Sequence, residues 1–414
     1  MQRGQLGDEV RAWIAANWAP DLSLLEWRRL LLAGGWACPT WPVEWYGQGL
    51  PAWADHVVAS ELAAAGAVGV PLGGGMALAA PTILIHGSDD VKRRFLARIV
   101  TGEDTWCQLF SEPGSGSDLA GLTTSAVRDG DEWVVSGQKL WSTSAHHADY
   151  GMLLARTDWD VPKHQGISWM VLPMHQAGVE ARPLKQMNGH ASFNEVFLTD
   201  ARVPVANVVG RPGDGWTVAR TTLAHERGFA SLRRPRFAVD RGRALQEAEA
   251  EARSHFETYR WYPQRAGRVD LVVEHARAAG RSTDPVARQQ IAGLLSSQSA
   301  HQWTSQRAAD NRAAGRAPGP EGSLGKLGLS VVARRAAVVH SLLAGASGML
   351  DGRSATFDGV IAEVLTSVPA QSIAGGTDEV QRNIIGERVL ALPKEPQVDR
   401  DIPFKELKVG TQGR

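Results

Sequence analysis

The spacing of apolar residues changes twice along this chain and divides it into three zones. From residue 8 to about 99, apolar residues recur at intervals of three and four, which predicts amphipathic helices. From 106 to about 204, short alternating or β-branched runs are separated by turn residues such as Asn188-Gly189, which predicts antiparallel hairpins. Beyond 215 the helical spacing returns and continues almost to 392. We therefore expect an α+β protein in which a helical domain, a β domain and a second helical domain follow one another.

The expected domain boundaries lie where the pattern changes. They give an N-terminal helical domain at 1–105, a middle β domain at 106–214, a C-terminal helical bundle at 215–396 and a tail at 397–414. A chain of 414 residues has room for two or three domains and a large buried core. Its 44 basic and 44 acidic residues balance, so no net charge favours nucleic acid or an anionic membrane. We expect no nucleic-acid partner.

The chain contains two cysteines, Cys38 and Cys107, and no C-x-x-C pattern for zinc or redox chemistry. This predicts neither a disulfide framework nor a metal site, and it is typical of a cytoplasmic protein. The first ten residues lack the apolar core of a secretory signal. Residues 63–85 carry no charge and match the ~20 residues of a membrane span, but Gly and Pro interrupt them. We expect two buried helices joined by a glycine-rich turn there, and no membrane span.

Three motifs carry the most specific chemical signal. The first motif, residues 110–118, reads F-S-E-P-G-S-G-S-D; the second, residues 137–144, reads G-Q-K-L-W-S-T-S; and the third, residues 375–387, reads G-G-T-D-E-V-Q-R-N-I-I-G-E. The Gly-Ser turn of the first motif exposes backbone N–H groups and small hydroxyls that allow a ligand to approach closely. In this order, and within a helix–sheet–helix chain, the motifs closely resemble those of the acyl-CoA dehydrogenase family.

The resemblance implies an FAD-dependent enzyme that removes an α proton and a β hydride from a CoA thioester, with the hydride passing to flavin N5. It also implies electron transfer to an electron-transfer flavoprotein, in fatty-acid or steroid catabolism. Substrate contacts are implied for Ser117 and Arg227. The residues that it assigns to the flavin are Gln108, Phe110, Ser111, Ser117, Trp141, Ser142, Thr143, Arg288, Gln289, Gly376, Thr377 and Glu379.

The catalytic base is implied at an unusual position. Many members carry a glutamate directly before the Gly-Thr pair, where this chain has Gly375. Members resembling isovaleryl-CoA and long-chain enzymes place it instead on the helix that opens the C-terminal domain, and Glu226 falls there. Gly375 retains its backbone N–H, which the family uses to stabilise negative charge on the thioester oxygen. We therefore expect Glu226 to be the base and Gly375 an oxyanion donor.

Two other segments depart from the family pattern, residues 284–292 and residues 342–349, where L-L-A-G-A-S-G-M replaces the usual Gln and Gly-Gly-x-Gly segment. The R-x-x-F-G motif, whose arginine reaches the flavin of a neighbouring subunit, is replaced by residues 284–292, where Arg288 and Gln289 are the expected substitutes. Such changes resemble actinobacterial members, including steroid side-chain enzymes built from two different subunits. We expect a tetramer or dimer, of one chain or two. Residues 233–268 form either a solvated helix with a packed turn, or a subunit contact or cavity wall.

Three functions stay open on the sequence. The chain is either a catalytic dehydrogenase or a non-catalytic or half-catalytic partner subunit of a heteromeric one. A flavin oxidase or monooxygenase on the same fold is the third possibility. Retention of Glu226 and of both β-domain motifs favours the first, while the length or steroid nature of the acyl group is not encoded in a readable pattern.

Overall fold

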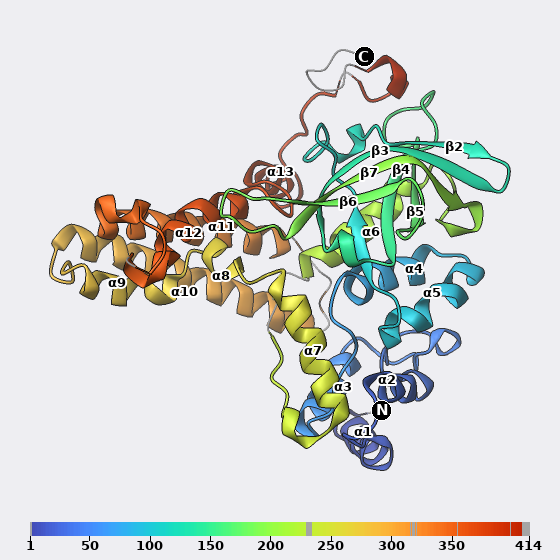
Figure 1. Cartoon of the computed structure of the whole chain (residues 1–414), viewed down its shortest axis with the longest axis horizontal. Coiled ribbons are helices and arrows are strands. Elements are labelled where there is room, and N and C mark those ends of the chain that lie inside the picture. The colour runs from blue at the N-terminus through green and yellow to red at the C-terminus, as the bar shows by residue number, and fades with distance from the viewer. Residues whose placement is uncertain are drawn as a thin grey trace. The chain divides into compact units, whose positions relative to one another are not determined.

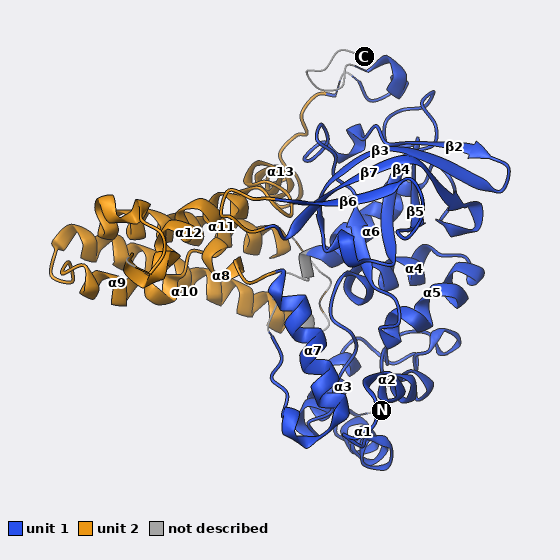
Figure 2. Ribbon diagram, viewed as in Figure 1, with its two compact units in different colours: residues 1–184, 191–258, 397–414 blue, residues 185–190, 259–396 orange. Residues whose placement is uncertain are grey.

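The computed structural model describes residues 2–228, 234–314, 316, 319, 321–353, 355–397 and 399–407. Within them the chain forms two compact units, coloured in Figure 2 and described separately below. Unit 1 comprises Met1–Leu184, Ala191–Thr258 and Gln397–Arg414, and unit 2 comprises Lys185–His190 and Tyr259–Pro396. The helix–sheet–helix order predicted from the sequence is confirmed, and the elements are labelled in Figure 1.

Unit 1 begins with helices built around a tryptophan-rich core. Trp27 is fully buried there, and it packs against Trp13 and Trp18 with ring centroids 5.7 and 4.7 Å away. Ser23 and Glu26 form a capping box that starts the second helix, as the S-x-x-E spacing requires. The helices are α1 (Arg3–Asn17), α2 (Leu24–Ala33), α3 (Ala54–Ala64), the π-helical turn Gly75–Ala79, α4 (Ala80–His86) and α5 (Asp89–Thr101).

The uncharged segment 63–85 is divided as the sequence predicts. Helix α3 ends at Ala64, a loop containing left-handed Gly66 and Gly73 follows, and helical structure resumes at Gly75. Among the described residues, the segment Glu321–Met349 alone reaches the length and hydropathy of a membrane span. This criterion considers only length and composition, and a helix packed in a protein core also satisfies it. Ser330, Ala336 and Val339 of this segment are buried.

The β part of unit 1 is one sheet of eight strands. They pair in the order β6-β7-β3-β2-β4-β5-β8, with β1 pairing to β4. The antiparallel hairpin β2–β3 turns at Asp129-Gly130-Asp131, but β1 runs parallel to β4, because the long segment between them allows a crossover. The strands are β1 (Trp106–Leu109), β2 (Ser125–Asp129), β3 (Glu132–Thr143), β4 (Tyr150–Arg156), β5 (Ile167–Pro173), β6 (Val179–Leu184), β7 (Phe193–Pro204) and β8 (Val208–Val209).

Two further helices complete unit 1, α6 (Gly215–Gly228) and α7 (Arg243–Glu257). Helix α6 lies beside the sheet and α4 (Figure 1), where Thr222 Oγ1 lies 3.0 Å from Thr82 Oγ1 and Thr221 Oγ1 lies 2.8 Å from His86 Nε2. These two contacts hold α6 against α4.

Helix α7 is only in part the solvated helix that we considered for its sequence. Leu245 and Ala248 are buried in one cluster with the N-terminal helices. Its glutamates also have partners there, since Glu251 binds the buried guanidinium of Arg28 at 2.7 and 2.9 Å and Glu247 accepts from the N–H of Leu24 at 2.8 Å. The opposite face of α7, which includes Gln246, Ala250 and Arg253, is exposed, so the solvated interpretation holds for one face of the helix and fails for the other.

Unit 2 is a helical bundle in which α10 and α11 pack side by side along much of their length (Figure 1). Its core contains Ala287 and Leu294 from α10 and Val332 and Val339 from α11. The helices are α8 (Tyr262–Arg265), α9 (Val272–Ala278), α10 (Pro285–Ala313), α11 (Glu321–Ala344), α12 (Val360–Ser367) and α13 (Asp378–Arg388).

A buried histidine pair joins α9 to α11. His275 Nδ1 and His340 Nδ1 are 2.9 Å apart, and His340 Nε2 lies 3.2 Å from the Arg268 carbonyl. A carbonyl only accepts, so His340 carries its proton on Nε2 and accepts from His275 at Nδ1. This arrangement requires the His340 ring to be neutral, because its Nε2 donates while its Nδ1 accepts. Burial, and secondarily the His340 ring, lowers the pKa of His275 to about 4 from the ordinary 6.5.

We expect this pair to make unit 2 less stable in acid. Between pH 6.5 and about 4, the ring of His275 binds a proton in the unfolded state but not in the folded state. The free energy of unfolding therefore decreases as the pH is lowered from 6.5 to about 4. The loss is roughly 3 kcal/mol at 1.36 kcal/mol per pKa unit. Denaturant unfolding of the wild type and of His275→Gln measures it, because the variant is expected to have a shallower pH slope. The same change at exposed His56 is the control; equal slopes for wild type and His275→Gln would contradict the prediction.

Candidate functional site

The second motif presents an indole ring on a β-bulge. Pairing between β3 and β7 shifts register between Lys139 and Ser142, and Trp141 within the shift has a left-handed backbone, φ 63°. Its side chain is 53% exposed and meets Phe193 edge-on, with ring centroids 5.7 Å apart. Bulges commonly re-aim a side chain next to a functional site, and a left-handed tryptophan persists only where its surroundings require it.

The first motif forms a tight turn with open space around its glycines. Glu112 and Ser115 exchange two backbone hydrogen bonds of 3.0 Å, which close the turn over Pro113 and Gly114. A Cβ on Gly114 or on Gly116 would meet no atom within 4 Å. The turn therefore offers backbone and hydroxyl donors that a ligand can approach without steric hindrance.

A fully buried lysine connects the two motifs. Lys139 Nζ donates to the Phe110 carbonyl at 3.1 Å and to Glu112 Oε1 at 2.8 Å, and the N–H of Leu140 donates to the Ser111 carbonyl at 2.9 Å. Removing this ammonium would leave the Glu112 carboxylate buried without its counter-charge. The relative position of the two motifs thus depends on an ion pair inside the sheet.

The Glu112 carboxylate is the most heavily hydrogen-bonded acid in this region. Beyond Lys139, it accepts from the N–H of Thr124 at 2.9 Å and from the N–H and Oγ1 of Thr123 at 2.7 and 3.0 Å. Burial raises the pKa of Glu112, but the Lys139 charge and the donors of Lys139, Thr124 and Thr123 outweigh burial and lower the pKa to about 2. Glu112 is therefore ionised, and its charge opposes the lowering of the Lys139 pKa by burial.

The predicted base lies against the strand that leads into the first motif. Glu226 is partly buried near the end of α6, and Gln108 Nε2 on β1 donates to its Oε2 at 3.3 Å. Gln108 is two residues before Phe110, so the carboxylate lies close to the beginning of that motif. The side chain of Arg227 lies outside the described part of the structure.

The third motif, in unit 2, begins with a turn that favours glycine. Gly375 and Gly376 are left-handed, with φ values of 68° and 85°. A Cβ on Gly375 would have free space but a strained backbone, so the turn favours glycine there. Thr377 Oγ1 accepts from the N–H of Val380 as the cap of α13, and Glu379 is exposed in the first turn.

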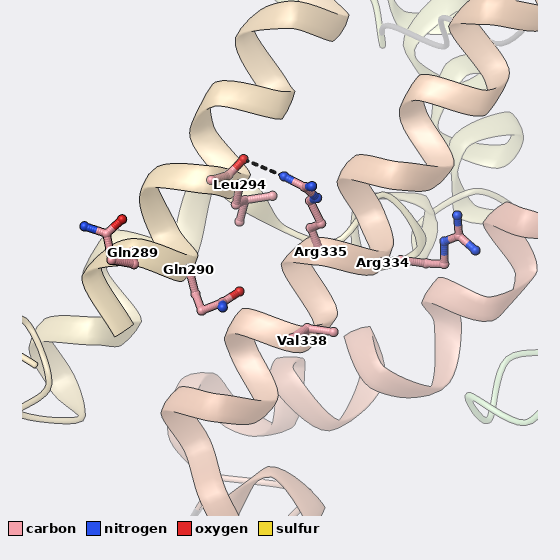
Figure 3. A pocket seen from close by; sticks show the side chains of 7 residues that line it. Gln289, Gln290, Leu294, Arg334, Arg335 and Val338 are labelled. Atoms are coloured by element: carbon pink, nitrogen blue, oxygen red, sulfur yellow. Dashed lines mark hydrogen bonds between the residues drawn. The ribbon is translucent and has the colours of Figure 1, made fainter. Parts of the chain in front are cut away.

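Arg288 and Gln289 lie near the start of α10. Arg288 Nη1 donates to the Ser282 carbonyl at 3.3 Å. Gln289 borders a shallow depression of about 390 Å³ between α10 and α11, with Gln290, Gly293, Leu294, Arg334, Arg335 and Val338. Figure 3 shows Gln290 pointing toward the space between the helices and Gln289 pointing away from α11. The side chains of the two glutamines therefore lie on different sides of α10.

The structure places the candidate residues in two groups. Unit 1 holds Gln108, Phe110, Ser111, Ser117, Trp141, Ser142, Thr143 and Glu226, and unit 2 holds Arg288, Gln289, Gly375, Gly376, Thr377 and Glu379. The sequence reasoning missed Glu112 and Lys139, although each is a charged residue inside one of the motifs. Among the described residues, no group of three or more His, Cys, Asp or Glu side chains is arranged to hold a metal ion.

Comparison with known families accounts for most of the chain. Residues 4–103, 107–201 and 265–390 match the acyl-CoA dehydrogenase N-terminal, middle and C-terminal domains. The acyl-CoA dehydrogenase IpdE1 of Mycobacterium tuberculosis is 34% identical, over 94% of this chain and 97% of its own length. The acyl-CoA dehydrogenase FadE34 of the same organism is 37% identical over 93% of this chain, which spans 49% of that protein.

Solved structures agree with the sequence matches. The ChsE4–ChsE5 complex from Mycobacterium tuberculosis is 29% identical with a TM-score of 0.64, covering 95% of this chain and 98% of the other. A structure described as the Tcur3481–Tcur3483 steroid ACAD is 26% identical with a TM-score of 0.63, covering 95% and 98%. The chain belongs to the acyl-CoA dehydrogenase family, whose members are FAD-dependent oxidoreductases. The resemblance carried by the three motifs is thereby confirmed.

Proposed function

We propose that this chain binds FAD and desaturates a CoA thioester between its α and β carbons, with Glu226 as the base. The observation that carries the proposal is the placement of the Glu226 carboxylate beside Gln108, at the entrance to the first motif, within the unit that also presents the exposed Trp141 ring. An acid, a planar aromatic surface and a turn of open backbone donors together suit this chemistry.

The residues of unit 1 fit the cofactor by their chemistry. The open glycines of the first motif suit a pyrophosphate, and the exposed indole of Trp141 suits a planar ring. Ser142 Oγ, next to that indole, is buried without a hydrogen-bond partner in the described part of the structure. FAD, when bound, supplies the acceptor for the hydride that leaves the β carbon. Phe110, Ser111, Ser117 and Thr143 belong to the same proposed site, and Arg288, Gln289, Gly376, Thr377 and Glu379 of unit 2 remain proposed contributors.

The chain's own groups would handle the proton and the developing negative charge. Glu226 would accept the α proton, since a carboxylate excluded from water becomes a stronger base. The backbone N–H of Gly375 would donate to the thioester oxygen, which stabilises charge as the proton leaves. Ser117 and Arg227 would contact the CoA portion. Glycine at 375 is compatible with this role, because the donor belongs to the backbone.

The partners and location in the proposal rest on the family. An electron-transfer flavoprotein would accept the electrons, and the enzyme would be a dimer or tetramer. The similarity to the ChsE4–ChsE5 complex supports testing a second, different subunit, and the similarity to the steroid ACAD supports a steroid-derived thioester as the first substrate. A cytoplasmic location is supported by two buried free thiols, one of which, Cys107, has its pKa raised by burial to about 12.

Purification followed by anaerobic reduction tests the proposal. The protein is expected to be yellow and to lose flavin absorbance when one of a panel of short, long, branched or steroidal CoA thioesters is added without oxygen. A colourless protein that gains flavin only with a co-expressed second subunit would indicate the partner-subunit function instead. Rapid turnover with oxygen as the only acceptor would indicate an oxidase.

A further inference from the structure

The C-terminal residues 399–407 lie on the β part of unit 1. The N–H of Phe404 donates to the Val161 carbonyl at 2.9 Å, and the N–H of Lys405 donates to the Trp159 carbonyl at 3.0 Å. Pro403 forms an isolated bridge with Pro162, and the Phe404 side chain is fully buried. This segment follows unit 2 in the chain but returns to unit 1, so its docking is a long-range contact of specific geometry.

Phe404 covers a buried arginine. Arg156, at the end of β4, is fully buried, and its Cζ lies 3.4 Å from the centroid of the Phe404 ring. A guanidinium over an aromatic face is stabilised most strongly when both are out of water. The ring therefore contributes one face of the environment that holds this cation in place.

The same guanidinium holds the chain that leaves the first motif. Arg156 donates to three carbonyls: Ala120 at 2.7 Å, Leu122 at 3.1 Å and Lys163 at 3.2 Å. Residues Leu119–Gly121 form a short 3-10 turn immediately after Asp118, the last residue of the motif. A planar cation with several donors fixes these carbonyls more rigidly than one hydrogen bond would.

A second cation connects the motif to the C-terminal segment directly. Lys163 Nζ lies 3.1 and 3.2 Å from the two carboxylate oxygens of Asp118, and 3.9 Å from Asp399. Lys163 is 22% exposed and Asp118 is 63% exposed, so only the lysine side of this contact is protected from solvent. Two routes thus run from residues 399–407 to the end of the Gly-Ser turn, one through Arg156 and one through Lys163.

We propose that residues 399–407 are a positioning segment, in which Phe404 acts through Arg156 to hold the Gly-Ser turn of the first motif ready for a pyrophosphate. The pyrophosphate would belong to FAD or to CoA. The inference rests on the proposed function for the identity of that ligand, but not for the rigidity of the turn. Pre-organising the turn lowers the entropy that binding must otherwise remove.

Hydrogen exchange on the protein without added cofactor tests the rigidity. Phe404→Leu keeps an apolar side chain but removes the ring face, and amide exchange in residues 118–124 is expected to be about tenfold faster than in the wild type. Val272→Ala, at a fully buried position of unit 2, is the control for general destabilisation. Unchanged exchange in Phe404→Leu, or an equal increase in Val272→Ala, would overturn the proposal.

Binding measurements separate the two sources of pyrophosphate. If FAD is the ligand, Phe404→Leu is expected to raise its dissociation constant about tenfold; if CoA is, the KM for the thioester rises by that factor while kcat changes little. Lys163→Met is the second variant, and combining it with Phe404→Leu should give less than the sum of the single effects. Strictly additive effects would argue against a shared role. A wild type that binds neither ligand would refute the proposed function, while the exchange result would still decide the role of the segment.

Discussion

Replacing Glu226 with Gln is expected to reduce thioester turnover by about 10²–10⁴-fold, the range for loss of a general base. The amide has nearly the shape of the carboxylate and still provides an oxygen that can accept from Gln108, so the site should remain assembled. Flavin content is expected to match the wild type, whereas loss of flavin absorbance on mixing with a thioester is expected to slow by the same factor. The measurement is anaerobic single-turnover loss of flavin absorbance.

Two controls distinguish a lost base from a damaged protein. Glu9→Gln, on the exposed side of α1, makes the same chemical change where no role is proposed and should leave turnover unaltered. Glu226→Asp keeps the acid but withdraws it by one methylene, so it should retain more activity than Gln. Turnover by Glu226→Gln within tenfold of the wild type would remove Glu226 from the mechanism and require another proton acceptor.

Replacing Lys139 with Met is expected to cause the largest loss of stability, about 3–5 kcal/mol, because it leaves the buried Glu112 charge without its partner. A typical domain has about 5–15 kcal/mol in total, so the effect is readily measured by denaturant unfolding. Flavin binding should weaken too, since the two motifs lose their connection. Lys139→Met combined with Glu112→Gln should be less destabilised than Lys139→Met alone, because no charge then remains unpaired.

An exposed ion pair in the same sheet provides the matched control. Arg182 and Glu180 on β6 are 57% and 59% exposed, and Arg182→Met should change stability little. Equal losses for Arg182→Met and Lys139→Met would contradict the role of the buried pair. The pH dependence gives an independent reading. Since the pKa of Glu112 falls from 4.5 to about 2 on folding, its contribution is present above pH 4.5 and is lost as the pH falls through 2.

The sequence predicts the architecture well, because the three zones differ in periodicity, and periodicity follows from which face of an element is buried. The sequence does not predict burial or strand pairing where these depend on a partner that is distant in the chain. A solvated helix was considered for α7 because the local sequence does not show that its glutamates bind Arg28 and the N–H of Leu24, which lie more than 200 residues earlier. The parallel pairing of β1 with β4 is equally invisible, since a strand pattern does not specify its neighbour.

The site shows the same division. The motifs identify Phe110, Ser117 and Trp141, but not what holds them. Lys139 occurs in a motif and still reads as an ordinary surface lysine, because its burial depends on the depth of the sheet at that point. Phe404 stands in a tail with no periodic pattern, and only the folded chain brings its ring over Arg156.

The irregular pairing near the end of β3 separates two side chains that a regular strand would keep together. Residues two apart on a strand face the same way, so Lys139 and Trp141 would normally share a side of the sheet. Between them β3 uses three steps where β7 uses two, from the pairing Lys139↔Val196 to Ser142↔Asn194. One extra residue thus inverts the parity of the strand, leaving the ammonium inside and turning the indole out. The length of this stretch is therefore constrained more tightly than its composition, and a one-residue deletion here would exchange inside for outside.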